Sequence, residues 1–258
     1  MLYFIDSEFI ESFHKPFFGK RRHFIDLISI SLIAEDGRKY NAISSEYRFR
    51  DASDWVKENV IRPLYSNKVS GLGRQFIHPD NFHKQPGIGK SNAQIAKEIV
   101  AFVNPGLNYP ESAHAVSEVG KGENLYDHFE KHDVAVINGH YVARPQFYAD
   151  YADYDWVLFC SLFGTMMDLP AGFPMFCNDI QQMFNDTVRM EMRHNRVPMS
   201  RFDEYSKLFK ERPEYPKEEN CHLSEYDVRY CKDQYDYFTL TQNVLLMRLR
   251  EQNPNDNG

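Results

Sequence analysis

Short runs of apolar residues, separated by polar turns, open the chain. Residues 2–5 are apolar and end in the polar residues 6–8, residues 24–34 form a longer run rich in isoleucine, and residues 39–49 resume the pattern after an acidic turn with glycine at 35–37. Runs of strand-forming residues on either side of an Asp-Gly pair are typical of a β-hairpin. The pattern therefore predicts three strands, of which the second and third form a hairpin.

Helical spacing of apolar residues begins after residue 50. It predicts helices over residues 51–64, 91–103, 154–163, 176–194, 202–209 and 223–249, while a run at 147–151 predicts a further strand. The segments 66–90 and 104–132 are irregular and rich in Gly, His and Pro, so we expect a loop-rich insertion at about 66–144. Strands followed by alternating strands and helices are typical of a layered α/β architecture, here within one domain over residues 1–258.

Composition and charge limit the classes of protein that this chain can be. Its 258 residues are 42% hydrophobic and 26% charged, which excludes a disordered, collagen-like or coiled-coil chain. A net charge of −7 excludes a protein that coats nucleic acid with lysines, because such binding neutralises many phosphates. No signal peptide or membrane span is recognisable, so we expect a cytoplasmic location and no membrane partner. The four cysteines form no Cys-x2-Cys pair and are expected to be reduced.

Two carboxylates end the first apolar run. Asp6 and Glu8 are two residues apart, and because side chains alternate between the faces of a strand, both point the same way while Ser7 points the other way. A pair of carboxylates is what Mg²⁺ or Mn²⁺ prefers as protein ligands. Taken alone, an Asp-x-Glu pair more often simply ends a strand at the surface.

The C-terminal half adds two further acidic motifs. Asp155 opens the predicted helix that continues Trp-Val-Leu-Phe, and His222-Leu-Ser-Glu-Tyr-Asp227 places a histidine five residues before an aspartate. Together with Asp6-Ser-Glu-Phe-Ile-Glu11, this ordered set resembles the DEDDh 3′-to-5′ exonuclease superfamily, which includes RNase T and oligoribonuclease. The resemblance is strongest to the small mycobacterial-type bacterial exoribonucleases. It covers roughly residues 1–64, 145–185 and 220–250.

The resemblance implies a fold, a reaction and a set of roles. The implied fold is RNase H-like, a mixed central sheet flanked by helices, with the active site where the first strand meets the C-terminal helix. The implied activity is a two-metal 3′-to-5′ exoribonuclease that hydrolyses single-stranded RNA from its 3′ end and releases nucleoside 5′-monophosphates. Members are often homodimers. The implied ligands of two Mg²⁺ or Mn²⁺ ions are Asp6, Glu8, Asp155 and Asp227. The implied general base is His222, and the implied contacts to the substrate are Ser7 and Phe9.

Several alternatives stay open at the level of sequence. Asp150 and Asp153 rival Asp155 as the mid-chain ligand, and Tyr226 replaces a small residue of the family motif beside His222, where it could crowd the base. A catalytically silent module that binds nucleotide or RNA would keep the same fold. A DNA-directed exonuclease is also open, because no residue can be assigned to the 2′-hydroxyl.

Overall fold

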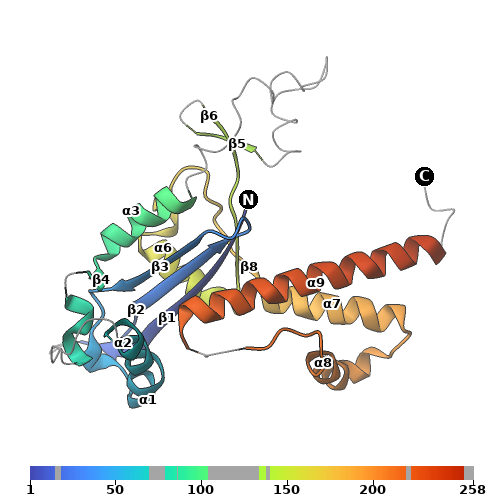
Figure 1. Cartoon of the computed structure of the whole chain (residues 1–258), viewed down its shortest axis with the longest axis horizontal. Coiled ribbons are helices and arrows are strands. Elements are labelled where there is room, and N and C mark those ends of the chain that lie inside the picture. The colour runs from blue at the N-terminus through green and yellow to red at the C-terminus, as the bar shows by residue number, and fades with distance from the viewer. Residues whose placement is uncertain are drawn as a thin grey trace.

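The protein is described here from a computed structural model, which defines residues 1–14, 19–69, 79–85, 87–103, 134–137, 140–218 and 222–252. A six-stranded mixed sheet in the order β4-β3-β2-β1-β7-β8 forms its centre (Figure 1). Strands β1 (Leu2–His14), β2 (Arg22–Ala34) and β3 (Lys39–Ser44) are antiparallel neighbours. The three strands and the hairpin predicted from the sequence are therefore confirmed.

Parallel strands complete both edges of this sheet. β7 (Gln146–Ala149) pairs with the first residues of β1, and β8 (Asn178–Asp179) pairs with β7. At the other edge, β4 (Gly89–Lys90) pairs with the end of β3. A separate hairpin of β5 (Val134–Ile137) and β6 (His140–Ala143) forms its own two-stranded sheet. The architecture is a mixed α/β sheet with flanking helices, which is compatible with an RNase H-like fold.

β1 is longer than the apolar run that predicted it. The strand was expected to end at residues 6–8, but it continues to His14 because Phe9 and Ile10 keep the alternation beyond the polar residues. Its pairing with β2 shifts by one residue after Glu8, so that Ile28 is an extra residue on β2, a β-bulge. The two carboxylates therefore lie in the middle of a strand rather than at its end.

The helices match the predicted positions, with shifts at their ends. The segment predicted over 51–64 is α1 (Asp54–Val56), a π-helical stretch (Lys57–Ile61) and α2 (Arg62–Val69). α7 (Ile180–His194) begins four residues later than predicted because the Asp179 carboxylate accepts the N–H groups of Gln181 and Gln182, which caps the helix. The other bounds are α3 (Asn92–Val103), α6 (Asp153–Ser161), α8 (Phe202–Lys210) and α9 (Ser224–Gln252).

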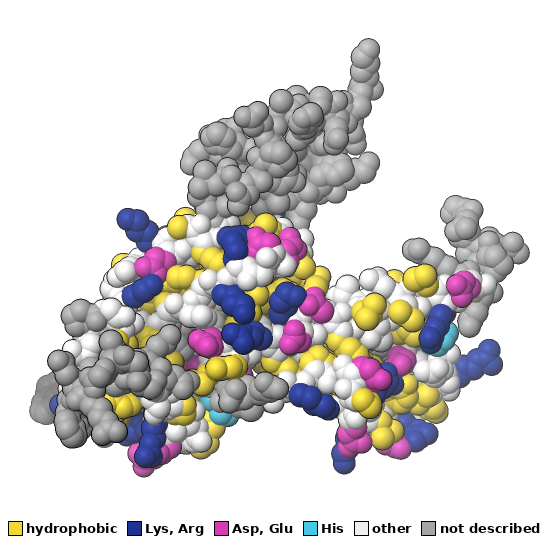
Figure 2. All heavy atoms as spheres, in the orientation of Figure 1, with side chains coloured by type: hydrophobic (Ala, Val, Ile, Leu, Met, Phe, Trp, Pro, Cys, Tyr) yellow, Lys and Arg dark blue, Asp and Glu magenta, His cyan; other side chains and the backbone are white. Residues whose placement is uncertain are grey.

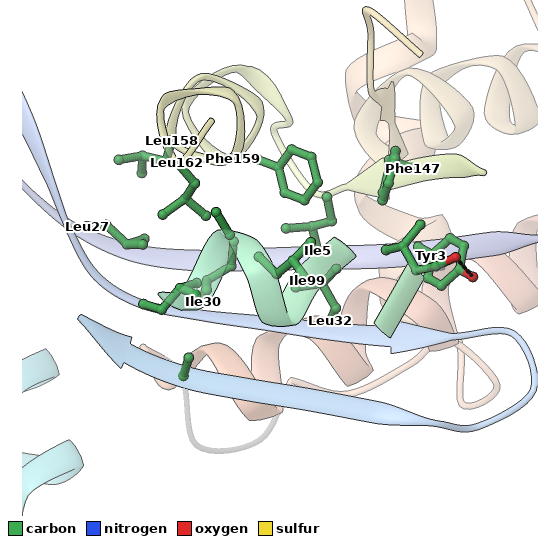
Figure 3. Packing of buried hydrophobic residues seen from close by; sticks show 14 of the residues in the cluster. Tyr3, Ile5, Leu27, Ile30, Leu32, Ile99, Phe147, Leu158, Phe159 and Leu162 are labelled. Atoms are coloured by element: carbon green, nitrogen blue, oxygen red, sulfur yellow. Dashed lines mark hydrogen bonds between the residues drawn. The ribbon is translucent and has the colours of Figure 1, made fainter. Parts of the chain in front are cut away.

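The two faces of the sheet have separate hydrophobic cores. α3 and α6 cover one face, where Ile99, Phe147 and Phe159 pack on side chains of β1 and β2 (Figure 3). α9 covers the other face, α7 packs on α9 and α8 on α7, and this layer surrounds Phe4, Phe184 and Phe238 (Figure 1). β1 contributes to both cores through alternate residues, with Ile5 facing the first and Phe4 the second.

Part of the predicted insertion belongs to the central fold. α3 packs into the first core, β4 extends the sheet, and a 3-10 helix over Pro79–Lys84 places Phe82 in a third apolar cluster with residues of β1 and α1–α2. The segment 104–132, which was predicted to be irregular, lies outside the described residues, as does Cys221. Cys160, Cys177 and Cys231 are free thiols, as predicted.

Candidate functional site

β1 presents two carboxylates to the helical layer that contains α9. Asp6 and Glu8 face that layer together with Phe4, because all three have even positions on one strand. β7 pairs with β1 only as far as Phe4, so from Ile5 onward the edge of β1 has no strand partner among the described residues. The first turns of α6 and α9 flank this open edge, which leaves room for groups from three segments to meet.

Asp227 lies in the first turn of α9 and joins the two carboxylates of β1. One oxygen from each of Asp6, Glu8 and Asp227 lies within 4.8 Å of the others. Asp227 lies 219 positions after Glu8 and 221 after Asp6 along the chain, so only the fold brings it next to them. The structure therefore assembles three of the four residues that the sequence predicts as metal ligands into one cluster.

Three small serines allow α9 to approach the sheet at this point. Ser29 and Ser31 of β2 pair directly with Glu8 and Asp6 of β1, so they lie on the same face. The Ser224 hydroxyl is 3.2 Å from the Ser29 hydroxyl and 2.8 Å from the Ser31 hydroxyl, and all three side chains are buried. Sequence reasoning missed these residues. The available signal was the Ile-Ser-Ile-Ser pattern, in which small polar residues replace apolar ones on one face of a core strand.

Asp155 reaches the same region from the other side of β1. It lies in the first turn of α6, is 7% exposed, and accepts a hydrogen bond of 2.5 Å from the Ser7 hydroxyl. It is not part of the cluster within 4.8 Å, but after burial its charge is the largest cause of the raised pKa of Asp6. Asp155 is thus an electrostatic neighbour of the three-carboxylate cluster.

The two rivals of Asp155 have different surroundings. Asp153 is exposed and lines a pocket of about 500 Å³ with Phe176 and Asp179, between α6 and α7. Asp150 is half-buried and accepts a hydrogen bond of 2.6 Å from the Gln181 amide. Of the three aspartates, Asp155 is the one that is held against β1 by a residue next to both carboxylates.

Burial makes these carboxylates less acidic, and for Asp6 and Glu8 the neighbouring carboxylates add to the effect. Burial, followed by the charge of Asp227, raises the pKa of Glu8 to about 8. Burial raises the pKa of Asp155 to about 7 against the hydrogen bonds from Ser7, and raises that of Asp227 to about 6. Burial and the neighbouring carboxylates hold the pKa of Asp6 well above its ordinary value. Like charges that are buried together favour protonation unless a cation compensates them.

Two oxygens in the cluster are buried without a hydrogen-bond donor. Asp6 Oδ2 and Asp227 Oδ1 have no such partner among the residues that the structure describes. Buried carboxylate oxygens need a donor or a cation, and a hard divalent cation accepts several of them at once. The donor set, its crowding and these two oxygens therefore fit Mg²⁺ or Mn²⁺.

His222 lies just before α9, at the mouth of the cluster. It has a left-handed backbone with φ of +67°, and its backbone N–H donates to Asp227 Oδ2 at 2.8 Å. Its ring is exposed and contacts the edge of Trp55 at 4.8 Å between ring centroids. Tyr226, expected to crowd this histidine, instead packs on the third apolar cluster, with Arg229 5.3 Å from its ring.

The two predicted substrate contacts differ in exposure. Ser7 is 6% exposed and its hydroxyl donates a hydrogen bond to Asp155, so its side chain is engaged with that carboxylate. Phe9 is half-buried and its ring lies 5.2 Å from that of Tyr154. Tyr154 is 39% exposed. The rings of Phe9 and Tyr154 thus form the border of the site beside Asp155.

Comparison with known proteins adds an independent observation. The chain is 28% identical over 186 residues to proteins from two strains of Mycobacterium tuberculosis, CDC 1551 / Oshkosh and ATCC 25618 / H37Rv, in a match that covers 72% of this chain and 75% of each relative. Both are named 3'-5' exoribonuclease. No family profile matches the chain.

Among the described residues, none of the helices, α9 included, combines the length and the apolar character needed to cross a membrane.

Proposed function

We propose that this protein is a two-metal 3′-to-5′ exoribonuclease that hydrolyses single-stranded RNA from its 3′ end and releases nucleoside 5′-monophosphates. Similarity to the two exoribonucleases supports a 3′-5′ exonuclease, and hence a hydrolase with RNA as substrate. The observation that carries the proposal is the cluster of Asp6, Glu8 and Asp227 within 4.8 Å, with Asp155 beside it. Such a donor set is suited to phosphodiester chemistry with divalent ions.

The carboxylates would hold two Mg²⁺ or Mn²⁺ ions. Ions bound there supply charge that activates a water molecule and stabilises the leaving 3′ oxygen. Four carboxylates carry a charge of −4 when ionised, and two divalent ions balance it. The charges of Asp155 and Glu8 each raise the pKa of Asp6, so Asp6 is the carboxylate that interacts with both of them.

His222 is proposed as the general base. A ring nitrogen of its exposed imidazole can accept the proton of the attacking water. The hydrogen bond from its backbone to Asp227 fixes where the residue sits relative to the carboxylates. Phe9 is proposed to pack on the terminal nucleotide, and Ser7 to orient Asp155 in addition to the substrate contact expected from the resemblance.

A 5′-labelled oligoribonucleotide tests the proposal. With Mg²⁺ or Mn²⁺, we expect stepwise shortening from the 3′ end and nucleoside 5′-monophosphate as product. Asp6→Asn and Glu8→Gln should lower the rate at least about a hundredfold, by analogy with the loss of one preorganised electrostatic group. Asp186→Asn, an exposed aspartate of α7 that pairs with Arg189, is the matched control. Absence of shortening, or shortening that persists in Asp6→Asn, would refute the proposal.

The same assay decides between the remaining alternatives. Asp155→Asn should lose activity and Asp153→Asn should keep it, and the reverse would move the mid-chain role to Asp153. Parallel digests of matched RNA and DNA strands give the sugar preference. Calorimetry with Mn²⁺ separates the enzyme from a silent binding module, because metal binding that disappears in Glu8→Gln supports the enzyme, whereas nucleotide binding that needs no metal supports the module.

A further inference from the structure

Beyond the carboxylates, β1 and β2 continue together as a two-stranded ribbon on the side of the molecule where α1 and α2 lie (Figure 1). Near its end the ribbon carries a group of exposed side chains that we call the basic arm. Its members are one aromatic residue, Phe13, which is 52% exposed, and three consecutive exposed cations. The cations are Lys20, Arg21 and Arg22.

The cations of the basic arm have no acidic partner in the part of the chain that the structure describes. None of the three forms an ion pair with any residue that the structure describes, whereas Arg48 nearby binds Asp26 through two nitrogens. Arg21 lies 4.5 Å above the Phe13 ring. An exposed ring beside unpaired cations contributes little to stability, but it is the combination that binds single-stranded nucleic acid, because rings stack on bases and cations neutralise phosphates.

The arm is connected to the border of the site by the face of β1 that carries Ser7, which is opposite to the face of Asp6 and Glu8. Phe9, Glu11 and Phe13 share that face because side chains two residues apart point the same way. Glu11, the acidic residue between the two rings, accepts hydrogen bonds from Tyr154 and from the His23 ring, so its charge is already engaged. From Glu8 to Phe13 the strand rises about 17 Å, a distance that spans several nucleotides of an extended strand.

We propose that the basic arm binds the RNA chain upstream of the 3′ end, so that strands of several nucleotides are preferred to dinucleotides. The inference rests on the proposed function, since the carboxylate cluster defines where the 3′ end lies. An acidic protein partner is the other class of ligand for three cations. RNA is favoured because the face of β1 that carries Phe13 leads back to the site border of Phe9 and Tyr154, and because the arm places an aromatic ring among its cations.

The test compares substrates of different length. The ratio of kcat/KM for a hexanucleotide to that for a dinucleotide should fall about tenfold in Arg21→Gln/Arg22→Gln and to a similar degree in Phe13→Ala, the latter from lost stacking. The slope of log affinity against log salt should also become about 1.4 less steep in the double variant, because about 0.7 is lost per phosphate for a single strand. Arg193→Gln/Arg248→Gln makes the same change of charge on α7 and α9 and should leave the ratio and the slope as in the wild type.

The outcomes for the arm and for the proposed function are separable. A length ratio unchanged by both arm variants overturns the inference while the enzyme assignment stands. If the wild type cleaves neither substrate, the proposed function fails, and anisotropy of a 5′-fluorescent hexanucleotide decides the arm by itself. Tenfold weaker binding by Arg21→Gln/Arg22→Gln than by the wild type then supports the arm as an RNA site, and equal binding overturns it.

Discussion

At the scale of single residues, the hydrogen bond from Ser7 positions the Asp155 carboxylate. Its hydroxyl donates to Asp155 across β1, and both groups are buried. Ser7→Ala removes this donor without adding volume. By comparison with residues that orient metal ligands elsewhere, we expect Mn²⁺ affinity and activity to fall about 10- to 100-fold. Calorimetric titration of the folded variant with Mn²⁺ measures the first, and the shortening assay measures the second.

Ser161 provides the control for that substitution. It lies on the same helix as Asp155, and its hydroxyl donates to the Leu158 carbonyl at 2.7 Å, away from the carboxylates. Ser161→Ala removes a hydroxyl of the same kind and should leave Mn²⁺ affinity unchanged. Equal effects of the two substitutions would show that Ser7 has no specific part in placing Asp155.

At the scale of secondary-structure elements, the distance between β2 and α9 depends on three small side chains. Ser31→Leu would place a branched side chain where the Ser31 and Ser224 hydroxyls are 2.8 Å apart. Overpacking of a filled core costs about 1–3 kcal/mol, and here it would also push Asp227 away from Asp6 and Glu8. We expect a loss of that size in urea unfolding, together with a loss of Mn²⁺ affinity of at least about tenfold.

Ile33→Val distinguishes lost stability from a displaced helix. Ile33 belongs to the core that contains Phe4 and Val228, on the same face of β2 as Ser31. The shorter side chain lowers the free energy of unfolding by about 0.5–1.5 kcal/mol but adds no volume between β2 and α9. It should leave Mn²⁺ affinity as in the wild type. If Ile33→Val weakens metal binding as strongly as Ser31→Leu does, general destabilisation explains both.

Local sequence patterns predicted most of the strands and helices, but they could not predict contacts between distant segments. Period-two alternation identified the strands and the shared face of Asp6 and Glu8, and helical spacing identified α3, α6, α8 and α9. The bulge at Ile28 could not be predicted, because a change of face inside an apolar run still reads as an apolar run. The length of β1 was underestimated because the polar residues 6–8 interrupt its hydrophobic pattern.

The candidate site shows the same division. Gathering of Asp6, Glu8 and Asp227 was predicted from a family resemblance and from strand geometry, and the structure places them together. The contact between Ser7 and Asp155 joins residues 148 positions apart, and that between Ser31 and Ser224 joins residues 193 apart. Serine is common in strands and helices, so nothing in its local sequence indicates which distant partner it meets.

At the scale of the whole molecule, the crowded carboxylates couple stability to pH. Their raised pKa values mean that between about pH 5 and 8 the folded protein holds protons that the unfolded chain has released. Stability of the metal-free protein must therefore fall as the pH rises through this range. We expect a loss of about 2 kcal/mol, or about 4–8 °C in Tm, between pH 5.5 and 8 in EDTA.

Bound metal and a neutral variant should both remove the loss of stability at high pH. Saturating Mn²⁺ at pH 8 should restore Tm, because about 2.7 kcal/mol is gained when the free ion is at 100 times its Kd. Asp6→Asn removes the charge that its neighbours share and should flatten the pH profile without metal. Asp186→Asn keeps the wild-type profile. A metal-free Tm that rises from pH 5.5 to 8 would contradict the predicted protonation of the cluster.

The overall charge of −7 bears on how RNA is bound. Figure 2 shows Lys and Arg side chains interspersed with Asp and Glu on one face, with no field of a single sign. Binding should therefore depend on the ions at the carboxylates and on the few cations of the basic arm. We expect a salt slope between about −2 and −3, measured by anisotropy at constant Mn²⁺, far from the steep slopes of proteins that cover long stretches of backbone. A slope as steep as about −6 would show that many more phosphates are contacted.

The open edge of β1 has a consequence for the protein in solution. Past Phe4 the strand has no neighbour on that side among the described residues, and unpaired strand edges are templates on which further chains can add. Charged side chains along an edge oppose such growth, so we expect Asp6 and Glu8 to oppose pairing of two copies of this chain through this edge. Neutral variants of the site should aggregate at lower concentrations than the wild type in metal-free buffer above pH 8, which light scattering would detect, and adding charge elsewhere on β1 should suppress it.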